Sequence, residues 1–247
     1  MPDTQDDVME RAYREIVSAS KFHNSNGPGK AKVLVMSGLP MSGKSHLTNL
    51  ITERMEGNVC VVRADEFRPV VAKHMGRSEP TYEKKEHALV FQIGEHLIAE
   101  SLRMGWSAIA DATNLTEEHR LWSVRPATET GRPVLVAFLE TRLEIAMERN
   151  RKKNRDGSTA TPAVYALLNY EKEPIEKCGT PYLVINSEID VRPWADILSK
   201  WLSGDIEAVD GTVTPKRPSQ EPEKQWQKYR QAAEEKARLR ESEGPGN

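Results

Sequence analysis

Two spacings of apolar residues alternate along the chain, and this alternation predicts the fold. Short apolar runs, typical of buried strands, occur at 32–37, 58–63, 107–110, 133–139 and 182–185. Between them, apolar residues three and four positions apart, typical of amphipathic helices, occur at 44–55, 81–104, 116–128, 141–150, 162–172 and 193–203. Because strands and helices alternate, the sequence predicts an α/β fold with a doubly wound, five-stranded parallel sheet.

The two ends of the chain differ from this alternating region. A helical pattern over 4–22 leads into a polar, glycine-containing stretch, so 1–30 is expected to form a helix and a linker. Residues 206–247 are rich in charge and proline and poor in aliphatic side chains, which favours a flexible or partly helical tail that recruits a protein partner. The remaining segment, 31–205, is the predicted domain.

Composition narrows the class of protein. The chain has 247 residues, a formal net charge of -2 and two cysteines, which argues against a disulfide-stapled secreted fold and against a chain that is basic throughout. The sequence contains no apolar run near the roughly 20 residues that span a bilayer, and its N-terminus is acidic rather than signal-like. We therefore expect a cytoplasmic protein with no membrane partner.

One motif indicates a phosphate-binding loop. The segment Gly38-Leu39-Pro40-Met41-Ser42-Gly43-Lys44-Ser45 fits G-x-x-x-x-G-K-[ST] and lies between a predicted strand and a predicted helix. Backbone N–H groups of such a loop surround a phosphate at the positive end of the helix. Lys44 is expected to reach the β- and γ-phosphates, and the Ser45 hydroxyl to coordinate magnesium. The predicted ligands are ATP and Mg²⁺.

Charged residues that follow the second and third predicted strands are candidates for a second substrate. Asp65 is suited to accept a proton from an acceptor hydroxyl, and Arg68, three residues on, to bind a phosphate or carboxylate; a helix-capping Asp beside a surface Arg is the alternative. Asp111 is expected to hold magnesium water or an acceptor, and Asn114 to bind substrate or orient a neighbour. Both types also bond their own backbone in turns. Arg120 is expected to be solvated.

A basic segment follows the fourth predicted strand. Five cations lie within seven residues, at Arg149, Arg151, Lys152, Lys153 and Arg155. Such a segment suits a lid that closes over a transferring phosphate. Contact with nucleic-acid phosphates or a solvated charge run are the alternatives.

Four segments in this order resemble a known group. The segment 38–45, Asp65-x-x-Arg68, Asp111-Ala-Thr-Asn114 and Arg149-Asn150 are similar to the P-loop kinases related to bacteriophage polynucleotide 5′-hydroxyl kinase, over about residues 32–190. The resemblance implies a P-loop kinase fold with a helical lid.

The resemblance also implies roles for individual residues. Asp65 would be the general base, Arg68 the clamp on the acceptor phosphate and Arg149 a lid residue. The group's Arg-Asn-x-x-Arg pattern has Lys153 at its fifth position here, so either Lys153 or Arg155 takes the second lid position.

Together these observations predict an ATP-dependent phosphotransferase. A nucleic-acid 5′-hydroxyl is the first expected acceptor, because of the basic segment. The alternatives are a kinase for a small hydroxyl metabolite (a nucleoside, sugar-nucleotide or antibiotic) and a nucleotide-binding switch or adaptor that is not a kinase.

Overall fold

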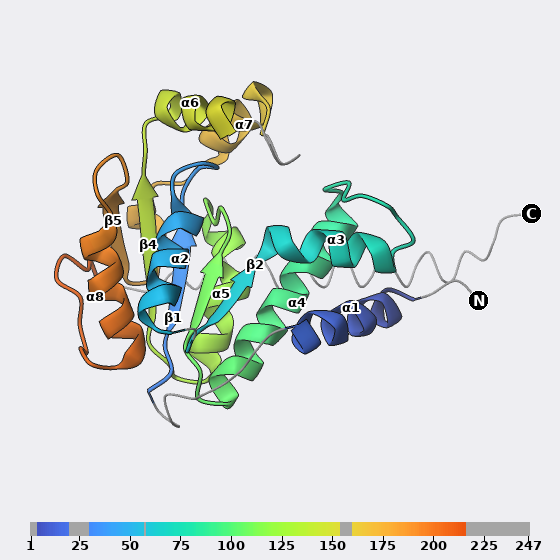
Figure 1. Cartoon of the computed structure of the whole chain (residues 1–247), viewed down its shortest axis with the longest axis horizontal. Helices are drawn as coiled ribbons and strands as arrows, with labels where there is room; N and C mark the ends of the chain where they lie inside the picture. Colours follow the sequence, from blue (N-terminus) through green and yellow to red (C-terminus); the bar gives the residue numbers. More distant parts are fainter. Residues whose placement is uncertain (1–3, 20–29, 57, 154–159, 216–247) are drawn as a thin grey trace, which may run out of the picture.

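The computed structural model describes residues 4–19, 30–56, 58–153 and 160–215. Its centre is a five-stranded sheet in the order β2-β3-β1-β4-β5, with every pair parallel. The strands are β1 (Val33–Ser37), β2 (Cys60–Arg63), β3 (Ala108–Asp111), β4 (Val134–Glu140) and β5 (Tyr182–Asn186). The predicted α/β fold and its five parallel strands are confirmed (Figure 1).

Helices cover both faces of this sheet (Figure 1). The described helices are α1 (Gln5–Ala19), α2 (Lys44–Arg54), α3 (Ala64–His74), α4 (Lys84–Arg103), α5 (Glu117–Glu129), α6 (Leu143–Lys153), α7 (Pro162–Glu171), the 3₁₀ turn η1 (Ile175–Lys177) and α8 (Arg192–Ser203). Apolar residues of α2 and α8 form one core cluster with the sheet. Those of α1, α3, α4 and α5 form the other cluster.

The central strand β1 shows why the strands read as continuous apolar runs. All five of its residues are fully buried. Val33 and Val35 pack in the α4 cluster, whereas Leu34 and Met36 pack in the α2 and α8 cluster. Because successive side chains point to opposite faces and both faces are covered, four of the five positions are apolar. The fifth residue, Ser37, donates its hydroxyl to the Asn114 carbonyl oxygen.

The carboxyl ends of the strands lie at one edge of the sheet. In the parallel register, Met36 of β1 and Arg63 of β2 both lie beside Asp111 of β3. The loops that leave β1, β2 and β3 therefore begin next to one another. Open parallel sheets bind their ligands at this edge, and α6 and α7 stand beyond it (Figure 1).

Helical structure extends further than the sequence pattern indicated in two places. The chain enters α3 directly after β2, although Pro69 lies within this helix. Helix α6 continues to Lys153, so part of the predicted basic loop is helical. Glu148 and Lys152 form an i,i+4 ion pair of 2.7 Å on α6, which favours the extra turn.

The ends of the described chain pack on the domain. Val8, Ala12 and Ile16 of α1 are buried in the α4 cluster, and Val213 pairs with Tyr182 at the start of β5. The predicted tail begins at 206, but Ile206 and Val209 pack in the α2 and α8 cluster. From residue 216 onward the tail lies outside the described residues. Within the described ranges, no helix is long and apolar enough to cross a membrane.

Candidate active site

The loop between β1 and α2 has the backbone of a phosphate cradle. Gly38, Met41 and Gly43 have φ values of 146°, 59° and 95°, and Gly43 directly precedes the first residue of α2. A Cβ atom on Gly38 would lie 2.7 Å from Ser42 Oγ and 2.8 Å from the Leu139 carbonyl oxygen. Only glycine fits this position, so the first glycine of the motif sets the shape of the loop.

Lys44 turns its ammonium group into the loop. Its Nζ donates hydrogen bonds to the carbonyl oxygens of Gly38 (3.0 Å) and Leu39 (2.7 Å). Burial lowers the pKa of Lys44 to about 8, although the carboxylates of Asp111 and Asp65 favour its charged form. A phosphate in the cradle would replace these carbonyl contacts with charge-assisted ones.

A cavity of about 460 Å³ adjoins the loop. Its lining combines the loop and the start of α2 with one residue of α6 and the β5–α8 connection; these are Met41, Gly43, Lys44, Ser45, His46, Arg149, Ser187, Glu188, Ile189, Asp190 and Val191. Its place beside the helix N-terminus suits a nucleotide whose phosphates lie in the loop.

Two residues attach α6 and α7 to the phosphate loop. Arg149 donates from Nη1 to the Met41 carbonyl oxygen (3.3 Å) and from Nη2 to that of Ser187 (2.9 Å). The hydroxyl of Tyr165 on α7 lies 3.2 Å from the Pro40 carbonyl oxygen, and this side chain is buried. The sequence analysis missed Tyr165, because one aromatic residue in an apolar helix resembles ordinary packing.

The other cations of the basic segment do not join Arg149 in the described structure. Arg151 lines a second cavity of about 450 Å³ between α6 and α7. Lys153 ends α6, and its side chain and the whole of Arg155 lie outside the described residues. The structure therefore brings Arg149 to the phosphate loop and leaves the choice between Lys153 and Arg155 open.

Asp111 is held at the end of β3 by a neighbouring strand. Its side chain is 3% exposed and accepts a hydrogen bond of 3.2 Å from Arg63 Nε. Arg63 also bonds Asn49 of α2 and Glu66 of α3. This network holds the Asp111 carboxylate close enough to Lys44 to influence the pKa of that lysine.

The donors needed for Mg²⁺ are present. Ser45 is exposed in the first turn of α2, and Asp111 offers a carboxylate at the same edge of the sheet. Hydroxyl and carboxylate oxygens, with phosphate oxygens and water, are the ligands that Mg²⁺ prefers. The residues therefore fit a magnesium–nucleotide complex.

Asn114 joins the turn after β3 to the base of the phosphate loop. It has a positive φ of 45°. Its Nδ2 donates to the Met36 carbonyl oxygen (2.9 Å), and its Oδ1 accepts from Trp122 Nε1 (3.1 Å). Its own carbonyl oxygen accepts from Ser37 Oγ (2.7 Å). Since both amide atoms are engaged inside the protein, the structure favours the alternative in which Asn114 orients its neighbours.

Arg120 corrects an expectation from the sequence. It is not solvated: its exposed fraction is 2%. Its Nη1 donates to the Asn114 carbonyl oxygen (2.9 Å), and its Nη2 lies 3.8 Å from Glu173. The contact with Glu173 comes from a segment distant in the chain, so no local pattern indicated the burial.

Asp65 and Arg68 share one face of α3, as their spacing predicted. Asp65 lies in the first turn, with its side chain 79% exposed, whereas the Arg68 side chain is 6% exposed. Asp65 Oδ1 and Arg68 Nε are 3.5 Å apart. The exposed carboxylate is available to a ligand at the sheet edge, and the guanidinium lies behind it.

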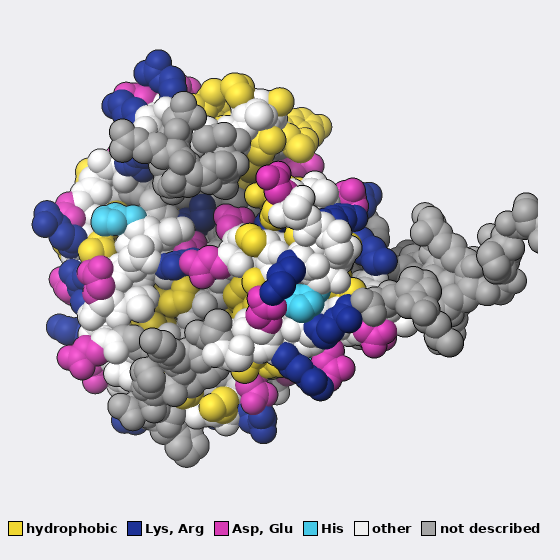
Figure 2. Space-filling model, turned by 45° about the vertical axis from the view of Figure 1, so that its right-hand side comes forward, with side chains coloured by type: hydrophobic (Ala, Val, Ile, Leu, Met, Phe, Trp, Pro, Cys, Tyr) yellow, Lys and Arg dark blue, Asp and Glu magenta, His cyan; other side chains and the backbone are white. Residues whose placement is uncertain are grey.

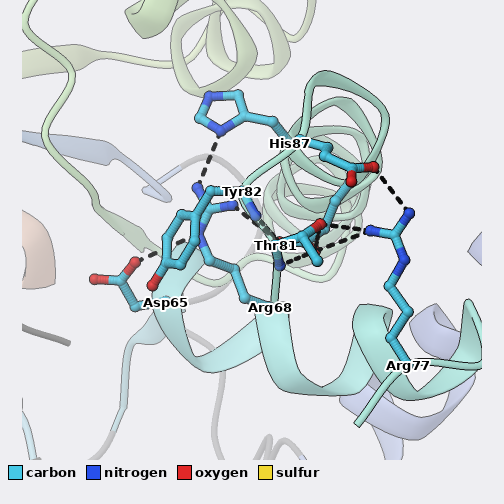
Figure 3. Close-up of polar contacts among 8 residues, drawn as sticks. Asp65, Arg68, Arg77, Thr81, Tyr82 and His87 are labelled. Atoms are coloured by element: carbon cyan, nitrogen blue, oxygen red, sulfur yellow. Dashed lines mark hydrogen bonds and ion pairs between the residues drawn. The ribbon is translucent and has the colours of Figure 1, made fainter. Parts of the chain in front are cut away.

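Three residues that the sequence analysis missed surround Arg68, and Figure 3 labels two of them, Tyr82 and His87. Its Nη1 lies 3.5 Å from Oε1 of the buried Glu86. Its Nη2 lies 3.1 Å from His87 Nδ1, and Tyr82 packs its ring 4.6 Å from the guanidinium carbon. These residues belong to α4 and to the turn before it, so Arg68 joins α3 to a segment more than ten residues away.

Glu86 keeps its charge although it is fully buried. Burial opposes ionisation, but hydrogen bonds from the Thr81 and Tyr82 backbone N–H groups and from the Thr81 hydroxyl, with the charge of Arg68, lower the pKa of Glu86. Arg77 Nη1 lies 3.7 Å from the same carboxylate. Glu86 therefore fixes both the turn at 81–82 and the guanidinium of Arg68.

His87 is neutral at this site. Burial, then the charges of Arg68 and His119, lower the pKa of His87 to about 4. Its ring packs edge-on against Phe91, with ring centroids 4.4 Å apart. A neutral imidazole next to Arg68 avoids a second positive charge in the cluster.

Comparison with known proteins places this arrangement in a family. A family model described as an AAA domain matches residues 33–176, which is more than half of the 247-residue chain. The chain belongs to this AAA domain family. The match includes the phosphate loop, Asp65, Arg68, Asp111 and Arg149, and it ends before β5. No curated protein matches the chain.

Solved structures share the fold of this AAA domain protein. A putative kinase from Chloroflexus aurantiacus J-10-fl is 18% identical with a TM-score of 0.56, over 73% of this chain and 100% of that chain. APE1195 is 20% identical with a TM-score of 0.55, over 71% and 96%. A sugar kinase from Janibacter sp. HTCC2649, in an unliganded structure, is 18% identical with a TM-score of 0.51, over 70% and 94%. At these identities the likeness establishes the fold.

Proposed function

We propose that this AAA domain protein is an ATP-dependent kinase that transfers a γ-phosphate to an acceptor hydroxyl. The observation that carries the proposal is the position of Asp65. Its exposed carboxylate follows β2 at the same sheet edge as the phosphate loop that follows β1, close enough to influence the pKa of Lys44. A carboxylate beside a phosphate cradle suits phosphoryl transfer.

The residues have distinct tasks in the proposed transfer. Asp65 takes the proton of the acceptor hydroxyl, whose oxygen bonds to the γ-phosphorus while the bond from that phosphorus to the β–γ bridging oxygen breaks and ADP leaves. Lys44 and Arg149 stabilise the negative charge on the phosphoryl oxygens. Ser45 and Asp111 are the residues that would hold Mg²⁺, which would neutralise phosphate charge when bound.

A nucleic-acid 5′-hydroxyl is the acceptor that we rank first. The motif order that resembles polynucleotide 5′-hydroxyl kinases supports it, together with the basic residues of α6. On the face shown in Figure 2, Lys and Arg side chains are interspersed with Asp and Glu. Such a surface suits recognition of a strand end rather than of a long backbone track, which needs a basic stripe.

A small hydroxyl metabolite is the second candidate. One structure with the same fold is named a sugar kinase, and the exposed Asp65 would serve a small alcohol equally well. A nucleotide-binding switch or adaptor, which would use the predicted tail (206–247) to contact a partner, predicts ATP binding without an acceptor.

A transfer assay separates these candidates. The full-length protein is incubated with Mg²⁺ and γ-labelled ATP and with one of three acceptors: a 5′-hydroxyl oligonucleotide, the same oligonucleotide already 5′-phosphorylated, or a panel of nucleosides and sugars. We expect label on the 5′-hydroxyl oligonucleotide and none on its phosphorylated control. Label on a small metabolite alone would favour the second candidate, and label on no acceptor would overturn the kinase proposal.

A further inference from the structure

Tyr82 stands out among the residues around Arg68 because it is an exposed aromatic side chain in an uncommon backbone conformation. Its exposed fraction is 57%, and its φ is 58°. Bulky residues seldom adopt positive φ, and when they do the surroundings must hold them there. The Glu86 carboxylate does so by accepting the Tyr82 N–H at 3.2 Å and the Thr81 N–H at 2.8 Å.

The strained turn places the phenol ring beside the proposed base. One face of the ring lies over the Arg68 guanidinium, 4.6 Å from its carbon atom. The same guanidinium contacts Asp65 at 3.5 Å. Figure 3 shows the ring lying across Arg68 with its hydroxyl end on the side of Asp65. An acceptor with its hydroxyl at Asp65 would therefore meet the ring of Tyr82.

The environment of Arg68 favours stacking over a grip on phosphate. Its Nε and Nη1 atoms are buried and make no hydrogen bond, and its Nη2 faces His87. The guanidinium offers its plane to Tyr82, while its Nε, Nη1 and Nη2 atoms lie beside Asp65, Glu86 and His87 of this chain. A cation behind an aromatic ring fixes the ring and leaves its other face for a ligand.

We infer that Tyr82, backed by Arg68, is the stacking surface for the heteroaromatic base of the nucleotide that carries the accepting hydroxyl. The inference rests on the proposed transfer to a 5′-hydroxyl and adds the way in which the terminal nucleotide is recognised. Stacking on an aromatic ring tolerates any base, because every base has a π-face. The acceptor class is thus a base-bearing 5′-hydroxyl end of any sequence, and an end without a base is a poor acceptor.

Two acceptors and three variants test the inference. The acceptors are a 5′-hydroxyl oligonucleotide and the same strand with an abasic first residue that keeps its 5′-hydroxyl. Tyr82→Asn removes the ring with a residue type that tolerates positive φ, and Tyr82→Phe keeps the ring. Tyr170→Ala, at a tyrosine of α7 that is 88% exposed, is the matched control.

The inference gives a specific pattern of kcat/KM. For the wild type and for Tyr82→Phe, we expect the abasic strand to be poorer than the base-bearing strand by roughly 5- to 150-fold. The kcat/KM of Tyr82→Asn should fall by that factor on the base-bearing strand and should be unchanged on the abasic strand. The KM for ATP should also be unchanged. Tyr170→Ala should match the wild type on both strands.

The outcomes separate this inference from the proposed function. Equal kcat/KM of the wild type on the two strands, or a preference for the base that survives in Tyr82→Asn, would overturn the stacking role while leaving the kinase proposal intact. Failure of the wild type to label either strand would overturn the nucleic-acid proposal, and the stacking role would fall with it.

Discussion

The phosphate loop and the cluster around Arg68 are built in opposite ways. The loop is one continuous segment, in which backbone groups form the cradle and Gly38, Met41 and Gly43 adopt positive φ. The Arg68 cluster is assembled from α3, α4 and the turn between them, and it works through side-chain charge. A continuous segment can be identified from eight letters of sequence, whereas a cluster depends on the tertiary fold.

The largest effect on activity is expected at the phosphate loop, from loss of the Lys44 charge. Lys44→Ala should abolish phosphoryl transfer, because the cradle loses the cation that contacts the phosphates. The fold should remain intact, since the hydrogen bonds of the ammonium all go to the loop itself, to the Gly38 and Leu39 carbonyl oxygens and the Ser42 hydroxyl. Transfer rates and circular dichroism check both points, and wild-type turnover in this variant would show that the loop is not the phosphate site.

The next largest effect on activity is expected at the Arg68 cluster, from loss of the Asp65 charge. Asp65→Asn should lower kcat by roughly 10²–10⁴-fold, because the amide cannot take the proton of the acceptor. Affinity for ATP should be retained. Glu66→Asn, at the adjacent exposed residue of α3, is the control and should keep most of the activity. Full activity in Asp65→Asn would leave Asp65 only as an acidic residue in the first turn of α3.

The buried pair of Glu86 and Arg68 should dominate stability at the acceptor side. Glu86→Gln leaves the Arg68 charge without its buried partner and should lower the free energy of unfolding by about 3–5 kcal/mol. Glu83→Gln, which affects an exposed pair with Arg77, should cost less than about 1 kcal/mol. Urea unfolding measures both, and equal effects would show that burial of the Glu86 charge is unimportant.

The pH dependence of ATP affinity is the smallest of these effects. The free protein loses the Lys44 proton near pH 8, and the charged ammonium is the form that binds phosphate. Affinity should therefore be constant below pH 8 and should fall by up to about tenfold per pH unit above it. Lys44→Arg, whose charge persists in this range, should show a weaker dependence; an identical decline in both proteins would exclude Lys44 as the cause.

The sequence predicted the parts of the molecule in which local pattern and tertiary structure agree. All five strands could be predicted because each contains a short apolar run, and β1 and β3 are buried along their whole length. The phosphate loop followed from its motif, and the shared face of Asp65 and Arg68 from their spacing. The full length of α3 could not be predicted from the sequence, because Pro69 lies within this helix.

Other residues had no local signal. Glu86 resembles a surface charge in the first turn of a helix, and it is buried because Arg68 and two backbone N–H groups meet it there. Arg120 is buried for the same kind of reason, through the Asn114 carbonyl oxygen and Glu173. Such residues become visible only when separate segments are placed together in space.

Calorimetric titration of the full-length protein with a non-hydrolysable ATP analogue and Mg²⁺ tests the central claim most directly. If residues 38–45 bind the phosphates, the wild type should bind one equivalent, and Lys44→Ala should show a large loss of affinity. Absence of binding heat in folded wild-type protein at several temperatures, or unchanged affinity in Lys44→Ala, would contradict the account.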